Sequence, residues 1–552
     1  MKKLSSVFIF IFLLFLVFYF GLPVLNYGFF QLPILAIIIV FVLLLMSMEF
    51  KTTNNGQGLL IKKQPNKILV YLLTILIVYA TAVPFFTTAP ILHTKKYQNL
   101  IGKVENGNEI TKQIEAISID EIRVVDRPLA YLLGEKILGS QPALGSQVEL
   151  GDFFIQKVNG KLYWVAPLLY SGFFKWLNQK EGTPGYVMVS ATNERDVTLV
   201  QNIKNEPIKI KYQPNAYFQS EIHRHVYFHG YTTVGLDDFS FEIDDEGRPF
   251  WVITTYKKKI GFSGNDATGV VVVNAQTGEI ESYTIDKTPD WVDRIQPSSF
   301  IEEQLNDWGE YVHGYWNFSN LEKLQTTEGL TLVYGKDNKS YWYTGITSVG
   351  KDESSVGFVL VDTRTKETTF YKQSGATEYA AQSSAEGKVQ EKNYRSSLPI
   401  PYNINNIPTY VMTLKDDGGL VKMYAMVAIS DYTIVGVGNT MRETLTSYKN
   451  VYNMADNKIS KSQSSSKNNI TAKVTRFQMD VKNGQSFYYF MVDGYQPIFV
   501  GSSQISNQLP VTNVGDSIKI SYDLDLEEVT DVATFENLTV NLKKLKDDKV
   551  KE

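Results

Sequence analysis

The 552-residue chain contains no cysteine, and this absence removes several classes of site at once. Disulfides, thiolate zinc sites, iron–sulfur clusters and cysteine nucleophiles all need that residue. The sequence also lacks a GxSxG elbow, a P-loop, a dinucleotide fingerprint and an HExxH motif. No catalytic class is therefore indicated by a motif. A domain without disulfides must be stabilised by its core, and 31 Phe, 33 Tyr and 7 Trp residues make such a core feasible.

Long apolar runs are missing after the first hundred residues, where three of them occur, at 7–20, 32–48 and 68–92. Each run is close to or above the ~17 to 25 residues with which a helix crosses a bilayer. We therefore predict three transmembrane helices that form a membrane anchor over residues 1–97, with the lipid bilayer as a partner. The runs hold no ionisable side chains, so transport through this anchor alone is not expected.

Lysines at the ends of these runs predict the orientation, because basic residues near short loops stay on the cytoplasmic side. With the N-terminus inside, six lysines lie in the cytoplasm and only Lys95 and Lys96 lie outside. We predict a multi-pass protein of the cell membrane whose large C-terminal domain, 98–552, is extracytoplasmic. The alternative is that residues 1–20 are a signal peptide, which would leave the orientation of the other two runs unchanged.

The two parts of the chain carry charge of opposite sign. Residues 1–97 hold eight Lys and one Glu, a balance of +7, and since the whole chain carries −4 the remainder carries −11. An acidic exterior of this size argues against nucleic acid as a partner. A cysteine-free exported chain rich in Lys, Asn and Tyr suggests the surface of a Gram-positive bacterium.

One supersecondary pattern returns four times in the exported part. A strand with a Tyr or Trp crosses a polar turn and enters a second strand of alternating aliphatic residues. The four copies run from Tyr163 and Trp164 to Gly185, from Phe250 and Trp251 to Gly269, from Tyr341 and Trp342 to Gly357, and, in degenerate form, around Tyr410. Recurrence of one unit is usually architectural, so we interpret the pattern as a property of the fold.

Start signals for helices occur between these strands. Asp126 and Pro128 precede one helical segment, Ser299 with Glu302 predicts a capping box, and Thr440 with Glu443 predicts another. Helices that alternate with β-meanders indicate an α+β fold, with helices packed on antiparallel sheets, over residues 98–456.

A polar, Ser-rich stretch predicts a flexible linker at 457–469. Residues 470–552 then show five short strands, which predict a separate small closed β-barrel of the OB or a related type. OB barrels often bind nucleic acid or sugars, but this segment lacks a basic groove.

The segment GVVVVNAQTGEIESYTID, preceded by FWVITTYKKK, resembles the PepSY pattern, in which two strands flank a turn of the form Asp or Asn, Ala, x, Thr, Gly, Glu. GFVLVDTRTKETTFY matches it loosely, with Arg364 and Thr365 in place of the Thr-Gly turn. A longer stretch from IRVVDRPLAYLLGEKILG to PTYVMTLKDDGGLVK is similar to a group of membrane-anchored Gram-positive surface proteins. The PepSY-like repeats imply an extracytoplasmic binding or regulatory module and do not imply catalysis.

Three of the five histidines fall within HRHVYFH, at His223, His225 and His229. On a strand the first two would point to one side and the third could join them after a bend, and three imidazoles are a zinc ligand set. Glu221 and Asp237 are nearby carboxylates. The preferred interpretation is local packing of each ring, with the metal site as the alternative. No other cofactor is indicated.

Two further segments have structural interpretations. Asp244, Asp245 and Glu246 lie between alternating strands and predict a hairpin turn. The aromatic stretch at 170–178 is read as core, with an exposed binding lip as the alternative.

The sequence as a whole predicts a non-enzymatic, membrane-anchored cell-surface protein that binds or regulates a protein or cell-envelope partner. Two alternatives stay open: a subunit of a larger membrane or envelope assembly, and a surface hydrolase with a cleft of dispersed carboxylates or the histidine cluster.

Overall fold

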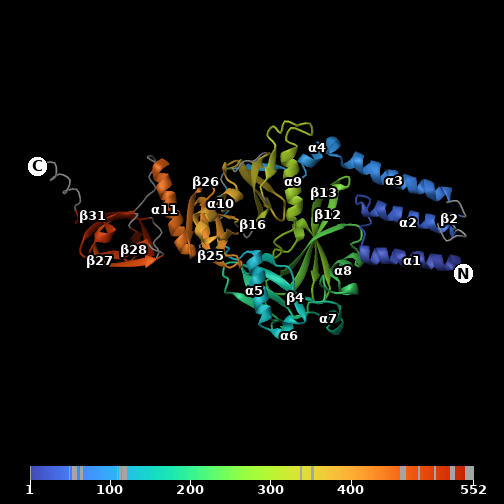
Figure 1. Cartoon of the computed structure of the whole chain (residues 1–552), viewed down its shortest axis with the longest axis horizontal. Helices are drawn as coiled ribbons and strands as arrows, with labels where there is room; N and C mark the ends of the chain where they lie inside the picture. The colour runs from blue at the N-terminus through green and yellow to red at the C-terminus, as the bar shows by residue number, and fades with distance from the viewer. Residues whose placement is uncertain are drawn as a thin grey trace. The chain divides into compact units, whose positions relative to one another are not determined.

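The chain divides into two compact units, Met1–Tyr448 and Lys449–Glu552, which are coloured from blue to orange and from orange to red in Figure 1. The computed structural model describes residues 2–48, 50–52, 59–61, 66–108, 110, 113–114, 121–327, 329–335, 339–349, 354–459, 468–482, 485–502, 505–522 and 529–540.

The predicted fold class is wrong in its membrane part. Among the described residues one helix, α3 (Lys67–Thr88), is long and apolar enough to cross a bilayer. The apolar helices at Phe10–Gly21, within α1 (Lys2–Gly21), and at Gln31–Ser47, which is α2, are shorter. At 1.5 Å per residue they extend about 18 and 26 Å, against a hydrocarbon core of about 30 Å. The described chain is a β-rich, multi-sheet structure with eleven α-helices.

The third apolar run is not one helix. α3 ends at Thr88, and α4 (Pro90–Gln98) begins with a proline, whose ring restricts the preceding residue. α2 packs along α3 and α1 contacts α2, so the three helices lie side by side at one end of the first unit (Figure 1). A short pair, β1 (Phe50–Thr52) and β2 (Leu59–Ile61), follows α2 in sequence.

Four sheets, antiparallel except for one pair of the described strands, form most of the first unit. They have the strand orders β4-β6-β7-β8 with β5 beside β6, β11-β12-β13-β14, β15-β17-β19-β20-β3 with β16 beside β17, and β22-β24-β25-β26 with β23 beside β24. Strand β3 pairs with β20 in parallel.

The strands of the first two sheets, in chain order, are β4 (Val148–Leu150), β5 (Phe154–Val158), β6 (Lys161–Tyr170), β7 (Tyr186–Ser190), β8 (Val197–Val200), β11 (Gly235–Ile243), β12 (Pro249–Ile260), β13 (Ser263–Asn274) and β14 (Ile280–Thr284). Those of the other two are β3 (Val104–Gly107), β15 (Leu324–Thr326), β16 (Thr331–Tyr334), β17 (Ser340–Ser348), β19 (Gly357–Asp362), β20 (Thr368–Tyr371), β22 (Arg395–Ser396), β23 (Ile400–Ile404), β24 (Ile407–Lys415), β25 (Val421–Ala428) and β26 (Asp431–Gly438). Two short pairs are β9 (Asn202–Ile203) with β10 (Glu206–Pro207), and β18 (Ser354–Ser355) with β21 (Gly375–Ala376).

Each of the four sequence copies is the central hairpin of one sheet: β6–β7, β12–β13, β17–β19 and β24–β25. In each hairpin the aromatic side chain donates a hydrogen bond to a backbone carbonyl oxygen of another segment. The indole Nε1 of Trp164 donates to the Val125 carbonyl oxygen at 2.8 Å, and that of Trp342 donates to the Gln296 carbonyl at 2.9 Å. Both carbonyls come two residues before a helix. In these two hairpins the tryptophan therefore forms a hydrogen bond to the segment that directly precedes the helix of the same repeat.

The other two copies show the same tie with variations. Trp251 donates to the Tyr212 carbonyl oxygen at 2.8 Å, and the Tyr410 hydroxyl donates to the Ala376 carbonyl at 3.3 Å. Ala376 again stands two residues before a helix. Tyr410 thus replaces tryptophan in the degenerate copy, so the repeat is structural in all four places.

One helix precedes each central hairpin: α5 (Arg127–Gly139), α8 (Ile222–Phe228), α9 (Ser298–Glu310) and α10 (Glu378–Lys388). α5 begins as predicted, because the Asp126 side chain accepts a hydrogen bond from the Leu129 amide at 3.0 Å. The capping box at Ser299 is wrong, since α9 begins at Ser298 after Pro297 and has no side-chain cap. Glu302 is therefore free for another role. Short helices α6 (Pro142–Gly145) and α7 (Phe173–Asn178) lie in the first repeat.

The second unit contains a closed five-stranded barrel with the order β27-β28-β29-β31-β30. Its strands are β27 (Asn468–Lys482), β28 (Gln485–Val492), β29 (Ile498–Ser502), β30 (Ser517–Tyr522) and β31 (Val529–Asn537). Phe490 and Phe499, both fully buried, stack with ring centroids 5.9 Å apart in its core. The five strands expected from the sequence are present, and assignment to the OB type stays a prediction.

The segment between the repeats and the barrel is shorter than the predicted linker 457–469. Helix α11 (Met441–Ile459) continues into it, and β27 begins at Asn468. The Thr440 hydroxyl accepts a hydrogen bond from the Glu443 amide at 3.2 Å, as expected of a cap. The division between the two compact units falls at Tyr448, within α11, whereas the sequence placed it at 456. Residues 460–467 lie outside the described part of the chain.

Candidate functional site

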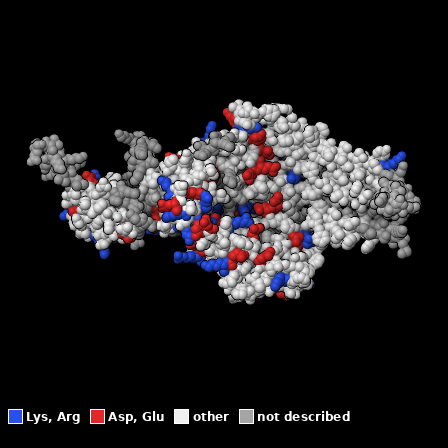
Figure 2. Space-filling view, viewed as in Figure 1, with Lys and Arg blue, Asp and Glu red and all other residues white. Residues whose placement is uncertain are grey.

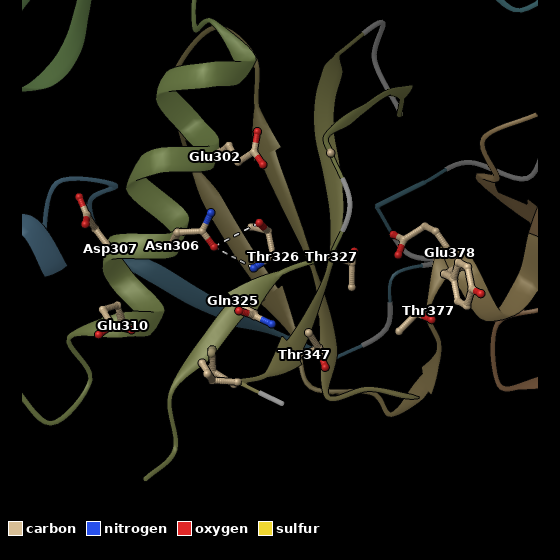
Figure 3. Close-up of a pocket in the computed structure, with 14 residues that line it drawn as sticks. Glu302, Asn306, Asp307, Glu310, Gln325, Thr326, Thr327, Thr347, Thr377 and Glu378 are labelled. Carbon is tan, nitrogen blue, oxygen red and sulfur yellow. Dashed lines mark hydrogen bonds between the residues drawn. The ribbon is translucent and has the colours of Figure 1, made fainter. Parts of the chain in front are cut away.

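An open cleft of about 800 Å³ lies between α9, the strands β15 and β17, and the start of α10 (Figure 3). We call it the acidic groove. Its lining residues are Glu302, Asn306, Asp307, Glu310, Leu324, Gln325, Thr326, Thr327, Gly329, Thr347, Val349, Thr377, Glu378 and Tyr379. Four of them are carboxylic acids, and none of these described lining residues is basic.

Helix α9 carries most of this charge. Asp and Glu side chains gather on the surface over its position in Figure 2. Burial, together with the neighbouring charges of Glu303 and Glu310, raises the pKa of the Asp307 carboxyl to about 7. Like charges three and four residues apart destabilise a helix. The carboxylates of α9 therefore repel one another, and a positively charged ligand would reduce this repulsion.

The acids of α9 take different positions. Figure 3 shows Glu302 on the side of the helix that faces β15, whereas Asp307 lies on the opposite side. Glu310 is partly neutralised, because the Nζ of Lys323 lies 2.6 Å from its Oε1. Glu302 is thus the acid of α9 that extends into the groove, with Glu310 at one end and Asp307 at the rim.

Glu378 is the buried acid of the groove. Its Oε1 accepts a hydrogen bond from the Gly345 amide at 3.0 Å, and burial raises the pKa of the carboxyl. Its Oε2 is buried, and the donor beside it is the Thr327 hydroxyl, toward which it points in Figure 3 and which partly lowers the pKa of the carboxyl. That hydroxyl also donates to the Gly345 carbonyl oxygen at 3.2 Å. The buried carboxylate therefore shares this donor, and a further donor brought into the groove would stabilise it.

Hydrogen-bonding side chains fill the wall between these acids. Asn306 Oδ1 accepts from the Thr326 amide at 2.9 Å and from its hydroxyl at 3.2 Å, which joins α9 to β15. Gly345 permits the close approach of Glu378, because a Cβ there would stand 3.1 Å from Glu378 Oε2 and 2.8 Å from the Thr327 hydroxyl. The wall is rigid and polar, and it offers acceptors to a ligand that carries N–H or O–H groups.

Sequence reasoning missed this site. The spacing of Glu302, Asn306 and Glu310 along a predicted helix was a usable signal, because residues four apart share one face. Glu302 was instead assigned to a capping box. Nothing in the local sequence around Glu378 indicates that its carboxylate is buried opposite a glycine of β17, some thirty residues away in sequence.

His223 and His225 lie on α8 and His229 is the residue that follows its last turn, so the strand expected there is wrong. Ile222 and Val226 are buried one turn apart, as on a helix, and Glu221 caps it by accepting from the His223 and Arg224 amides at 3.0 Å. The alternation in HRHVYFH resembled a strand, but the cap and the four-residue spacing of the buried residues decided for a helix.

The helix separates His223 from the other two imidazoles. The rings of His225 and His229 are 4.3 Å apart, while the His223 ring packs at 4.0 Å on Phe239. Burial lowers the pKa of His225, whose Nε2 lies 2.8 Å from the Gly278 carbonyl oxygen. Asp237 is on β11. The described residues contain no group of three His, Cys, Asp or Glu side chains placed to hold a metal ion.

Two other sequence predictions have clear outcomes. The residues Asp244 to Gly247 form the turn between β11 and β12, as expected, and Asp244 Oδ1 accepts from the Arg248 amide at 2.8 Å. The aromatic stretch at 170–178 is only partly core: Trp176 is buried, but Phe174 is 75% exposed.

A second group of acids is enclosed in the core of the first unit. Glu242 on β11 and Arg294 before α9 are both buried, with Glu242 Oε1 3.9 Å from an Arg294 Nη2. Asp293 accepts from the Lys157 amide at 2.9 Å and from the Tyr334 hydroxyl at 3.0 Å. Burial raises the pKa of Glu242 to about 7, although Arg294 lowers it. This group joins the first three repeats, and none of its residues lines the acidic groove.

Glu242 predicts a pH dependence of stability. The pKa of Glu242 is about 7 in the folded chain and about 4.5 in the unfolded chain. The stability that this group contributes to the free energy of unfolding is therefore fully present below pH 4.5 and is lost as the pH rises through 7. The loss is at most about 1.4 kcal/mol per pH unit. In Glu242→Gln, this part of the slope should be absent. The measurement is the urea midpoint from pH 4 to 8 by tryptophan fluorescence, which reports only on the first unit because all seven tryptophans lie within it. Parallel profiles for the two proteins would contradict the assignment.

Comparison with known proteins identifies no family: no family model matches the chain, and no curated protein matches it. Among solved structures, a mutant of B. megaterium levansucrase aligns over 75% of this chain and 96% of its own, at 8% identity and a TM-score of 0.18. Polysaccharide lyase Uly1 aligns over 62% and 74%, at 9% identity and a TM-score of 0.16. Scores this low show no shared fold.

Proposed function

We propose that this chain is a membrane-attached binding protein of the cell envelope that takes a positively charged peptide segment of an envelope protein into the acidic groove. The observation that carries the proposal is Glu378, a buried carboxylate whose neighbouring donor, the Thr327 hydroxyl, is shared with the Gly345 carbonyl, in a cleft whose described lining residues include three further acids and no basic residue. A lysine or arginine side chain would supply both a further donor and a compensating charge.

An organic cation is favoured over a metal ion. The described residues contain no three-ligand group for a metal. The hydroxyl and amide wall of the groove suits the several donors of a peptide, and a volume of about 800 Å³ lies within the usual range of ligand pockets.

Attachment to the membrane is supported by α3, the one described helix that is long and apolar enough. In sequence, Lys62, Lys63 and Lys67 precede this helix and Lys95 and Lys96 follow it, and further lysines stand near the N-terminus. This asymmetry favours a cytoplasmic N-terminus and an extracytoplasmic groove.

The test is titration of the detergent-solubilised full chain with tetralysine and, as a matched probe, tetraglutamate, by calorimetry. We expect binding of tetralysine only, weakened by salt. Glu302→Gln should weaken it about 5- to 30-fold, since a charge-assisted hydrogen bond contributes about 1 to 2 kcal/mol. Glu378→Gln, which keeps the shape of the buried side chain, should act in the same direction.

Glu206→Gln is the matched control, because it removes the same charge from an exposed residue of β10, which does not line the groove. It should leave the affinity within about twofold of the parent. Equal binding of both peptides, or equal effects of Glu302→Gln and Glu206→Gln, would contradict the proposal.

A further inference from the structure

An exposed group of apolar side chains lies on α7, on the short 3₁₀ turn η3 (Phe218–Ser220) and at the end of α8. We call it the aromatic patch. It consists of Phe173, Phe174, Leu177, Tyr217, Phe218 and Phe228, which are between 36% and 75% exposed. Scattered single apolar residues are normal on a protein surface, but a contiguous set marks an interaction site.

Ring contacts, directly or through Trp176, join four of the six patch residues: Phe173, Phe174, Tyr217 and Phe218. Phe173 packs against Tyr217 at 5.0 Å and against the buried Trp176 at 5.8 Å, and Trp176 packs against Phe218 at 5.5 Å. Phe174 contacts Phe173 at 5.6 Å. The patch is therefore a fixed surface that the fold holds in place.

Arg224 of α8 joins the patch to the apolar helix α1. Its Nη1 donates to the Phe218 carbonyl oxygen at 2.8 Å, and its Nε donates to the Tyr19 carbonyl at 3.0 Å. The guanidinium lies over the Tyr19 ring at 4.6 Å, and Phe228 stacks on that ring at 6.0 Å. The patch is thus continuous with the end of α1, whose Phe8 and Phe15 are also exposed.

The neighbouring ends of the other apolar helices contact the turn between β12 and β13 of the first unit. The Thr88 hydroxyl, at the end of α3, accepts from the Phe262 amide at 3.1 Å, and Phe30, which precedes α2, packs on Phe262 at 4.6 Å. Figure 1 places α7 and α8 at the end of the unit from which α1, α2 and α3 extend. Figure 2 shows almost no charged side chains over the apolar helices α1, α2 and α3.

We infer that the aromatic patch lies in the interfacial layer of the bilayer that α3 crosses, so that α7 holds the first repeat against the lipid surface. This inference rests on the membrane attachment in the proposed function and is independent of the groove. The composition of the patch suits the interfacial layer of a bilayer, where aromatic rings with flanking lysines are typical. Lys175 and Lys180 flank Trp176, and the Lys180 Nζ lies 5.7 Å from the centroid of the Trp176 ring.

The test uses the absence of cysteine, which allows one fluorescent label at a chosen site of the full chain. Phe174→Cys carries an environment-sensitive label in protein reconstituted into phosphatidylcholine and phosphatidylglycerol vesicles. We expect blue-shifted emission that lipid-borne nitroxide quenches at least twofold more than it quenches the control. The control is Phe318→Cys, a phenylalanine of nearly equal exposure, 73% against 75%, in the loop after α9.

Ile77→Cys, in the middle of α3, separates the two possible failures. Lipid-quenched emission at position 77 together with water-like emission at 174 would overturn the inference and leave the attachment intact. Water-like emission at 77 would contradict the attachment itself. Equal quenching at 174 and 318 would show that the vesicles bind the surface without specificity, and would also overturn the inference. Exposed side chains are replaced at 174 and 318, so folding should not be affected.

Discussion

Arg294→Met is expected to destabilise the first unit by about 3 to 5 kcal/mol. The side chain is buried between Glu242 and the ring of Phe154, whose centroid lies 5.9 Å from the guanidinium carbon. Methionine fills a similar volume but leaves Glu242 and the buried Asp293 without the positive charge beside them. Removing one partner of a buried ion pair costs more than the pair contributes, because the remaining charge cannot be solvated. The pKa of Glu242 should rise further above its ordinary value.

The measurement is the urea midpoint of the detergent-solubilised chain, followed by tryptophan fluorescence. Arg127→Met is the control: this arginine pairs with Asp152 at 2.8 Å on the surface, where both side chains are more than half exposed. Exposed pairs contribute about 0 to 1 kcal/mol, so the control should lie close to the parent. Similar losses in the two variants would show that the buried pair has no special role.

Gly185→Ala is expected to cost at least about 3 kcal/mol. Gly185 stands directly before β7, the second strand of the first repeat, with a φ of +102°, and a Cβ there would stand 1.9 Å from the Val200 carbonyl oxygen. That oxygen belongs to the backbone of β8, so the clash cannot be relieved by a side-chain rotation. Gly269 of the second repeat has the same close approach, to the Tyr283 carbonyl oxygen at 2.1 Å.

Gly230→Ala separates the clash from the backbone strain. Gly230 has a similar φ of +111°, but its Cβ would meet no atom within 4 Å. We expect this variant to lose only about 1 to 2 kcal/mol from strain, as measured by the same urea midpoint. If both glycine variants lose equal stability, close packing of the two strands does not explain the repeated glycine.

The local parts of the fold were predictable from the sequence, because they depend on interactions between residues that are close in sequence. The four recurrent hairpins follow from alternating side chains and turn residues, which act over a few neighbours. The Asp126 cap and the turn at Asp244 depend on hydrogen bonds within four residues. By contrast, the three-helix anchor was wrong, because the described apolar segments of α1 and α2, Phe10–Gly21 and Gln31–Ser47, are shorter than a membrane-spanning helix.

The sequence by itself determined the repeats, the absence of cysteine chemistry and the confinement of apolar runs to one end of the chain. Only the tertiary structure decided which acids form a site. Glu302 and Glu378 are brought to one groove by the packing of α9 on β15 and by a hydrogen bond from Gly345 to Glu378 across 33 residues of sequence. The histidines show the opposite case: they are close in sequence, but the helix α8 places His223 on a different face from His225 and His229. Long-range contacts depend on the sum of many weak packing terms, and no local pattern contains that sum.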